Sequence, residues 1–218
     1  MLLSTVFFIM FGLGFMYQQA VGLVRPKLSY VKRRIKAVQQ VEDEAPTEEL
    51  AAEDTSEATE IAKAISACRS SLSKRDVASF TSIVRKESRK YGHDWKLILA
   101  IIRAESQFNI RARSNKGARG LMQVLPSTAK WLSPRLGLEY KGRDSLYDPE
   151  YNVKLGTYYL HMMHRKFGDI EKAIAAYNRG PTGLLRYLSQ GKKLPCKYLE
   201  KVMAYYEELK SSSDEYAS

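Results

Sequence analysis

The sequence predicts an all-α protein: a compact multi-helix domain that is preceded by one N-terminal transmembrane helix and a disordered acidic linker. Three observations lead to this prediction. No run of alternating apolar and polar residues follows residue 60, so strands are not expected. Apolar residues recur there at steps of three and four between capping Asp and terminating Gly residues. The first 24 residues carry no charged side chain and are long enough to span a hydrocarbon layer.

Residues 1–24 are interpreted as an uncleaved membrane anchor. The alternative is a cleaved signal peptide, which usually has a basic start and small residues before the cut. Here the start is uncharged, and Gln18 stands where a small residue would precede a cut after Ala20. The sequence therefore favours an anchor that stays attached.

A basic segment and an acidic segment follow this anchor. Residues 25–41 carry six Lys and Arg side chains, which the positive-inside rule would place in the cytoplasm and which also suit contact with anionic lipid head groups. Residues 42–60 contain nine acidic residues and no basic one, a composition typical of a solvated, disordered linker with at most some frayed helix. The predicted domain covers residues 61–210, and residues 211–218 are predicted to be a tail.

The chain beyond the linker is strongly basic. Residues 61–218 hold 29 Lys and Arg against 15 Asp and Glu, a net charge of +14. This charge suits an anionic partner such as nucleic acid or a polyanionic cell-wall polymer, although a merely soluble basic surface has the same composition. Nucleic acid is not expected as a partner, because no nucleic-acid-binding motif is present and a membrane anchor suits that function poorly.

The first helices of the domain are predicted from caps and periodicity. Residues 76–91 place apolar side chains near one face, and Gly92 closes this helix. Asp94 can cap the next helix, over residues 95–106. Both helices are therefore expected to pack in the core.

The later helices carry equally clear signals. Asp148, Pro149 and Glu150 form a strong helix start, because a capping Asp precedes a Pro and an acid in the first turn. The apolar stripe that follows includes Gly156, which would let another helix approach closely. The remaining signals are Gly168 as the end of this helix, Asp169 as a cap for residues 170–178, a break at Gly180-Pro181, and a last helix over 196–210.

Glu105 stands at the end of an apolar helix, where a carboxylate is unexpected. Ile98, Ile101 and Ile102 precede it by seven, four and three positions and share its helix face. An apolar environment and the negative end of the helix dipole would both raise the pKa of this carboxyl, as a general acid requires. The alternative is a structural Glu that pairs with Arg103 or Arg119.

Polar residues farther along suit a ligand site. Gly117 and Gly120 fit a tight loop whose backbone can approach a ligand, and Ser114 and Gln123 offer hydrogen bonds in the same loop. Tyr177 falls in line with the apolar residues of its helix, so its ring would lie in the core while its hydroxyl reaches a polar site. An ordinary core Tyr with a satisfied hydroxyl is the alternative.

Four ordered motifs make the sequence similar to the soluble lytic transglycosylases, whose catalytic domain has a lysozyme-like helical fold. They are A-E-S at 104–106, S-x-x-G-A-x-G-L-M-Q at 114–123, N-V-x-L-G-x-x-Y-L at 152–160 and A-Y-N-x-G-P at 176–181. Together they are highly specific and cover about residues 76–190, although each alone would be weak. The chain departs from the family pattern at Asn115, where Pro is frequent, and at Arg179, where a small residue is usual.

The resemblance implies a set of site residues. Glu105 would be the sole catalytic acid and base. The substrate-binding residues that it implies are Ser106, Ser114, Gly120, Met122, Gln123, Tyr177 and Asn178. Ser114 would lie near the N-acetyl group of the saccharide, and Met122 and Gln123 would line the groove. Tyr177, supported by Asn178, would hold acid and substrate in register.

The resemblance also implies an activity. The enzyme would cleave peptidoglycan glycan strands between N-acetylmuramic acid and N-acetylglucosamine without water, leaving 1,6-anhydro ends, and would need no cofactor or metal. Together with the predicted anchor at residues 1–24, this activity implies a single-pass protein of the inner membrane, with its catalytic domain in the periplasm or otherwise outside the cytoplasm. The alternatives are a lysozyme of the same fold and a non-catalytic wall-binding module, although intact Glu105 and Tyr177 argue against the latter. Protein partners are not predicted.

The histidine and cysteine residues give weaker signals. His161 and His164 are three positions apart on a predicted helix, but no third ligand is evident, so a metal site is not expected. Cys68 and Cys196 lack metal-binding spacing. A disulfide between them is one alternative in an extracytoplasmic domain, and two small core residues are the other.

Overall fold

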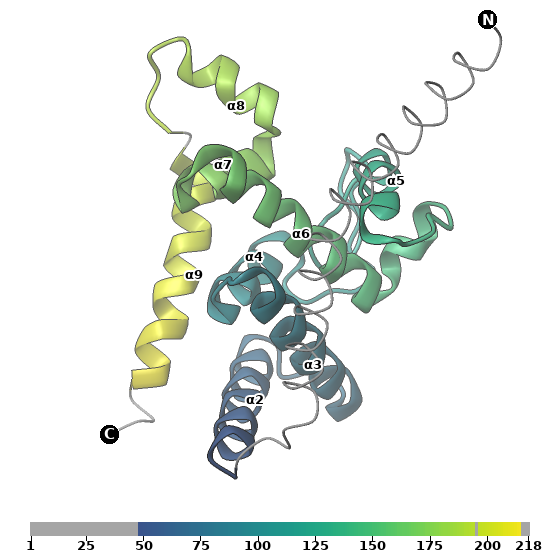
Figure 1. The fold of residues 1–218 in the computed structure, drawn as a ribbon, viewed down its shortest axis with the longest axis vertical. Coiled ribbons are helices and arrows are strands. Elements are labelled where there is room, and N and C mark those ends of the chain that lie inside the picture. Colours follow the sequence, from purple (N-terminus) through teal and green to yellow (C-terminus); the bar gives the residue numbers. More distant parts are fainter. Residues whose placement is uncertain (1–47, 195, 215–218) are drawn as a thin grey trace, which may run out of the picture. The chain divides into compact units, whose positions relative to one another are not determined.

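The computed structural model describes residues 48–194 and 196–214, and Figure 1 shows the arrangement of their helices. The chain divides into two units, residues 1–52 and residues 53–218. The predicted anchor (1–24) and basic segment (25–41) lie outside the described residues. Within the described part of the chain, no helix combines the length and apolarity that crossing a membrane requires.

The part of the chain that the structure describes is all-helical, as the sequence predicts. Its elements are α2 (Glu48–Cys68), α3 (Lys74–Tyr91), α4 (Trp95–Ser106), α5 (Pro126–Leu132), η1 (Ser133–Leu136), η2 (Arg143–Tyr147), α6 (Pro149–Phe167), α7 (Ile170–Arg179), α8 (Pro181–Leu188) and α9 (Cys196–Asp214). Extended pairing in residues 48–194 and 196–214 is limited to two isolated β-bridges, which join Arg113 to Arg119 and Arg119 to Val124.

Side-chain caps set most of the predicted helix ends. Asp94, Asp148 and Asp169 each accept a hydrogen bond from a backbone N–H in the first turn of α4, α6 and α7. Gly92 and Gly168 adopt the left-handed conformation that ends α3 and α6. The predicted bounds of these helices are therefore confirmed to within a few residues.

Several elements were not predicted. α3 begins at Lys74 because the side chain of Ser73 accepts a hydrogen bond from the backbone N–H of Asp76. This cap was not predicted from the sequence. α5, η1, η2 and α8 have eight residues or fewer, which is too short for a helical period to stand out in the sequence. α9 continues to Asp214, so half of the predicted tail is helical.

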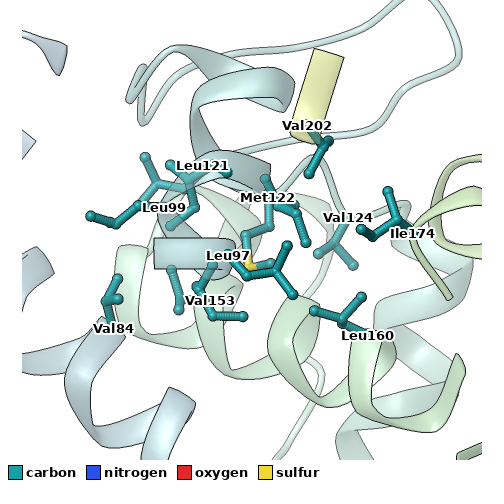
Figure 2. Packing of buried hydrophobic residues seen from close by; sticks show 14 of the residues in the cluster. Val84, Leu97, Leu99, Leu121, Met122, Val124, Val153, Leu160, Ile174 and Val202 are labelled. Carbon is teal, nitrogen blue, oxygen red and sulfur yellow. The ribbon is translucent and has the colours of Figure 1, made fainter. Parts of the chain in front are cut away.

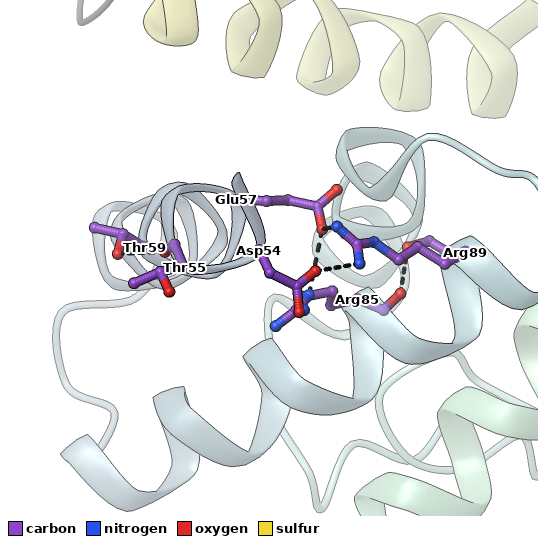
Figure 3. Close-up of polar contacts among 7 residues, drawn as sticks. Asp54, Thr55, Glu57, Thr59, Arg85 and Arg89 are labelled. Atoms are coloured by element: carbon purple, nitrogen blue, oxygen red, sulfur yellow. Dashed lines mark hydrogen bonds and ion pairs between the residues drawn. The ribbon is translucent and has the colours of Figure 1, made fainter. Parts of the chain in front are cut away.

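The predicted acidic linker needs correction. Residues 48–60 belong to α2, whereas the composition predicted a disordered linker with some frayed helix over 42–60, of which residues 42–47 lie outside the described residues. Asp54 pairs with Arg85 and Arg89 of α3, and Glu57 pairs with Arg89 at 2.7 Å, as Figure 3 shows. These arginines neutralise Asp54 and Glu57, which the composition of the segment had led us to expect in solvent. A cavity of about 690 Å³ lies beside this cluster, between α2 and α3, and none of the predicted site residues lines it.

α4 is the central helix of the domain. It packs most extensively on α9, while α6 packs on α7 and on α3. Every residue from Leu97 to Ile102 is buried, so α4 is apolar on all sides rather than along one stripe. Figure 2 shows this core, in which Leu97 and Leu99 belong to one cluster with side chains from the loop before α5 and from α6, α7 and α9. The burial of α4 explains why an apolar run leads up to Glu105.

Gly156 permits a close approach, but by a different partner than predicted. A Cβ at this position would lie 2.5 Å from the sulfur of Met122. Met122 belongs to the loop between α4 and α5 and is 0% exposed. The small residue therefore admits a buried side chain from a loop, and not a neighbouring helix.

The three histidines of the chain gather beside the start of α4. The ring of His93 lies 5.9 Å from that of His161 and 5.7 Å from that of His164. Burial, reinforced by the other two imidazoles, lowers the pKa of His93 to about 4. No group of metal-ligating side chains with the geometry of a metal site occurs among the residues that the structure describes.

Cys68 is a free thiol at the end of α2. Burial raises its pKa, and the charges of Arg103 and Glu208 act on it with opposite signs. The side chain of Cys196 lies outside the described part of the structure, so the choice between a disulfide and two core residues stays open.

Candidate active site

Glu105 lies on the last turn of α4, where the chain leaves the centre of the domain. The next residues, Gln107 and Phe108, both have positive φ angles, 49° and 59°, which residues other than glycine rarely adopt. Gln107 caps the helix by donating its N–H to the carbonyl of Arg103 at 3.1 Å, and Phe108 is buried in the core. The chain therefore turns sharply behind Glu105, whose side chain remains half-buried.

Two side chains of α9 reach this end of α4. The hydroxyl of Tyr198 donates to Oε1 of Glu105 at 2.6 Å. The ammonium of Lys201 donates to the carbonyl oxygen of Ala104 at 2.6 Å. Burial raises the pKa of Glu105 above its ordinary value, and the Tyr198 hydrogen bond and the Lys201 charge oppose this shift without cancelling it. Glu105 therefore holds its proton to a higher pH than an ordinary glutamate.

The alternative reading of Glu105 as the partner of a buried arginine is wrong. Arg103 pairs with Glu208 at 2.8 Å. Arg119 pairs with Asp144 at 3.1 Å and donates to the hydroxyl of Tyr147 at 2.7 Å. Both arginines are thus engaged elsewhere, and the contacts of Glu105 come from α9.

Tyr177 faces the same place from α7. Its hydroxyl donates to the backbone carbonyl of Met122 at 2.8 Å, and its ring lies edge-on to Tyr159 at 5.4 Å. Burial, together with the negative charge of Glu105, raises the pKa of Tyr177 well above its ordinary value. Tyr177 is therefore a neutral donor whose ring is fixed by the core, as its place on the helix predicts.

The loop between α4 and α5 is tied down by one buried residue of α6. Asn152 accepts from the backbone N–H of Met122 at 2.7 Å and donates to the carbonyls of Arg119 and Leu146, both at 2.8 Å. Gly120 has a φ of +76°, and a Cβ there would lie 2.4 Å from the amide nitrogen of Asn152. Asn152 thereby fixes the loop segment whose Met122 carbonyl receives Tyr177.

Two more loop side chains make internal hydrogen bonds. The amide of Gln123, a residue with a φ of 49°, donates to the carbonyls of Ala112 and Gly120 at 3.1 and 2.9 Å. The hydroxyl of Ser114 accepts from the backbone N–H of Ala118 at 3.1 Å. Both residues are half-buried, so each retains polar atoms at the loop surface.

Three residues of the predicted site have surroundings that differ from the prediction. Ser106 is buried, and its hydroxyl donates to the carbonyl of Ile102 within α4. The side chain of Met122 fills the core against Gly156 rather than facing solvent. Gly120 is approached by Asn152, from inside the protein. Ser106 thus belongs to the buried side of α4, while Met122 and Gly120 take part in the packing that holds the loop.

Tyr198, Lys201 and Asn152 were not predicted as site residues from the sequence. Tyr198 precedes Val202 by four positions, and Val202 is fully buried, so a buried face of α9 was readable from the helical period. Its partner Glu105 lies 93 positions away in the chain. Asn152 begins the motif at 152–160, and it is a polar residue of α6 that is 0% exposed.

The sequence is similar to a known protein family and to curated relatives. The family model described as "Transglycosylase SLT domain" matches residues 82–200. The chain is 38% identical over 130 residues to membrane-bound lytic murein transglycosylase C of Edwardsiella ictaluri, covering 52% of this chain and 34% of that protein. It is 36% identical over 130 residues to membrane-bound lytic murein transglycosylase E of Buchnera aphidicola, covering 55% and 58% of the two chains.

Solved structures agree with this likeness. An inactive variant of lytic transglycosylase Slt from Pseudomonas aeruginosa matches with a TM-score of 0.56 and 31% identity, over 61% of this chain and 24% of that chain. The soluble lytic transglycosylase in complex with bulgecin A matches with a TM-score of 0.54 and 27% identity, over 57% and 23% of the two chains. The chain spans about a third of the length of the first curated relative. Because the family model covers more than half of its residues and includes Glu105, Tyr177 and Tyr198, this protein belongs to the transglycosylase SLT domain family.

Proposed function

We propose that the protein is a peptidoglycan lytic transglycosylase in which Glu105 acts first as an acid and then as a base. The observation that carries this proposal is a half-buried carboxyl with a raised pKa, which receives the Tyr198 hydroxyl at 2.6 Å and faces Tyr177. A carboxyl that keeps its proton to a higher pH than an ordinary glutamate is suited to protonating a glycosidic oxygen.

The chemistry needs one carboxyl group. Glu105 gives its proton to the oxygen between N-acetylmuramic acid and N-acetylglucosamine as the bond from that oxygen to the anomeric carbon breaks. The N-acetyl group of the muramic acid supports the anomeric carbon. The Glu105 carboxylate then takes the proton of the 6-hydroxyl of the same sugar, whose oxygen bonds to the anomeric carbon and closes a 1,6-anhydro ring. The two proton transfers return Glu105 to its starting form.

Three other carboxylates of the domain have structural contacts of their own, which supports a mechanism with a single carboxyl. Glycosidases that use two carboxyl groups hold them about 5–9.5 Å apart. Asp144 pairs with Arg119, and Asp94 and Asp148 cap helices, so each of these carboxylates has a structural contact of its own. A substrate that supplies its own nucleophile removes the need for a second acid.

The two tyrosines have distinct parts in this proposal. Tyr198 stabilises the carboxylate that remains after the first proton transfer, because its hydroxyl donates to Oε1. Tyr177 holds the Met122 carbonyl and places its ring beside the carboxyl, which keeps acid and sugar in register. The net charge of +14 over residues 61–218 suits the carboxylates of the muramic peptides.

Mass spectrometry of the products tests this proposal. The full-length chain, incubated with purified wall sacculi, should release fragments with anhydro-muramic ends, which are about 18 mass units lighter than reducing ends because the sugar hydroxyl replaces water as the nucleophile. Predominantly reducing ends would identify a lysozyme. Binding to sacculi without any release would identify a wall-binding module.

We infer further that residues 1–24 anchor the chain in the inner membrane as a single helix, with residues 25–218 on the periplasmic side where the substrate lies. The uncharged apolar N-terminus and the membrane-bound naming of the relatives support this topology, and the basic residues 25–41 oppose it. A C-terminal alkaline phosphatase fusion should be active in cells. A stable fusion without phosphatase activity would place the domain in the cytoplasm.

A further inference from the structure

Lys201 sits on α9 one turn after Tyr198 and contacts the end of α4. Its ammonium donates to the carbonyl of Ala104, the residue directly before Glu105, at 2.6 Å. The last four carbonyls of a helix have no partner within the helix, and a cation near them is favoured by the helix dipole. Lys201 thereby holds a positive charge beside Glu105, although the residue is otherwise exposed.

The other groups that face Glu105 carry no positive charge. Tyr198 on α9 and Tyr177 on α7 both have a pKa raised well above the ordinary value, so each is a neutral hydroxyl. Tyr159 on α6 lies behind Tyr177, and its pKa is also raised by burial. Arg103, on the same helix as Glu105, is paired with Glu208. Among the described residues, Lys201 is thus the cation that acts on the Glu105 carboxyl.

We propose that Lys201 is a positioning residue that fixes the end of α4 and stabilises the ionised form of Glu105 between its two proton transfers. This inference rests on the proposed function, because it assumes that Glu105 gives up a proton and takes one back in each catalytic cycle. Burial favours the neutral carboxyl, whereas the Tyr198 hydrogen bond and the charge of Lys201 both favour the ionised form. Without its charge, the carboxylate formed by the first transfer is less stable and proton donation is slower.

Two substitutions separate the charge of Lys201 from its hydrogen bond. Lys201→Met removes both, whereas Lys201→Gln removes the charge and keeps a donor for the Ala104 carbonyl. Lys201→Arg keeps the charge and should restore the parent behaviour. Lys210→Met is the matched control, because it removes the same charge from the same helix about 13 Å farther along its axis, where Lys210 pairs with Glu207 at 3.2 Å.

The first readout is the titration of the Glu105 carboxyl, followed by carbon NMR in the full-length chain. Loss of the Lys201 charge removes a cause that lowers the pKa of Glu105, so the titration should move to higher pH in the Met and Gln variants. The titration of Glu105 should be unchanged in Lys210→Met, and in Lys201→Arg it should match that of the parent protein. This readout does not depend on activity.

The second readout is the pH profile of kcat on sacculi. Glu105 must be protonated for the first step, so activity falls as pH rises through its pKa, and a raised pKa moves this alkaline limb to higher pH. The plateau should drop about three- to tenfold in Lys201→Met and Lys201→Gln, in line with the loss of one nearby charge at a helix end.

The outcomes are distinguishable from failure of the proposed function. An unshifted Glu105 titration in both folded variants would overturn the role of Lys201, whatever the products are. A shift that Lys201→Arg fails to reverse would overturn it as well, because charge would not be the cause. A shifted titration in a protein that releases no anhydro ends would uphold the coupling of Lys201 to Glu105 and overturn the proposed reaction.

Discussion

Replacing Glu105 by glutamine should reduce release of anhydro-muramic fragments by about ten-thousand-fold or more, the upper end of what general acid–base catalysis contributes, because one group performs both proton transfers. Gln keeps the size of the side chain and an oxygen that accepts from Tyr198, but it has no proton to transfer. Initial rates on purified sacculi, with product masses, measure the loss.

The fold of this variant should survive. The raised pKa of Glu105 means that the folded state binds its proton more tightly than the unfolded state, so this group costs stability once pH rises above its unfolded pKa. Gln removes that cost, and urea unfolding at neutral pH should show equal or slightly greater stability. Glu139→Gln, on an exposed loop, is the control for the charge change. Near-normal activity of the Glu105 variant would remove this residue from the mechanism.

Replacing Asn152 by alanine should cause the second large effect, on stability. Asn152 is 0% exposed and satisfies one backbone N–H and two carbonyls, of Met122, Arg119 and Leu146. Buried polar groups that lose their partners cost roughly 1–3 kcal/mol each, so a loss of about 3–5 kcal/mol is expected. The midpoint of thermal unfolding should fall by about 10 °C for a domain of this size.

Activity should also suffer in the Asn152 variant below its melting temperature, because the Met122 carbonyl that receives Tyr177 loses its support. Circular dichroism during heating measures the first effect, and rates at a temperature where both proteins are folded measure the second. Asn115→Ala, in the exposed part of the same loop, should leave the midpoint within about 1 °C, as is usual for surface substitutions. Equal midpoints for the two variants would show that the loop has another support.

Local signals in the sequence predicted the bounds of several helices of the fold. The helix bounds at Asp94, Asp148, Asp169 and Gly168 were readable because a capping side chain acts on a backbone group within three or four positions. Short helices such as α5 and α8 were missed, because one or two turns leave no periodic pattern. The start of α2 was missed because composition does not reveal that Asp54 and Glu57 meet the arginines of α3.

In the candidate site, too, the features that follow from local helical spacing were predictable, and those that depend on packing between helices were not. The sequence by itself determined Glu105 at the end of an apolar helix and Tyr177 on a buried face, since both follow from helical spacing. Only the tertiary structure decided that Tyr198 and Lys201 meet the Glu105 end of α4, and that Met122 faces the core while its carbonyl holds Tyr177. These contacts join residues that lie 55 to 97 positions apart. No local period encodes such a pairing, which arises from how α4, α7 and α9 pack.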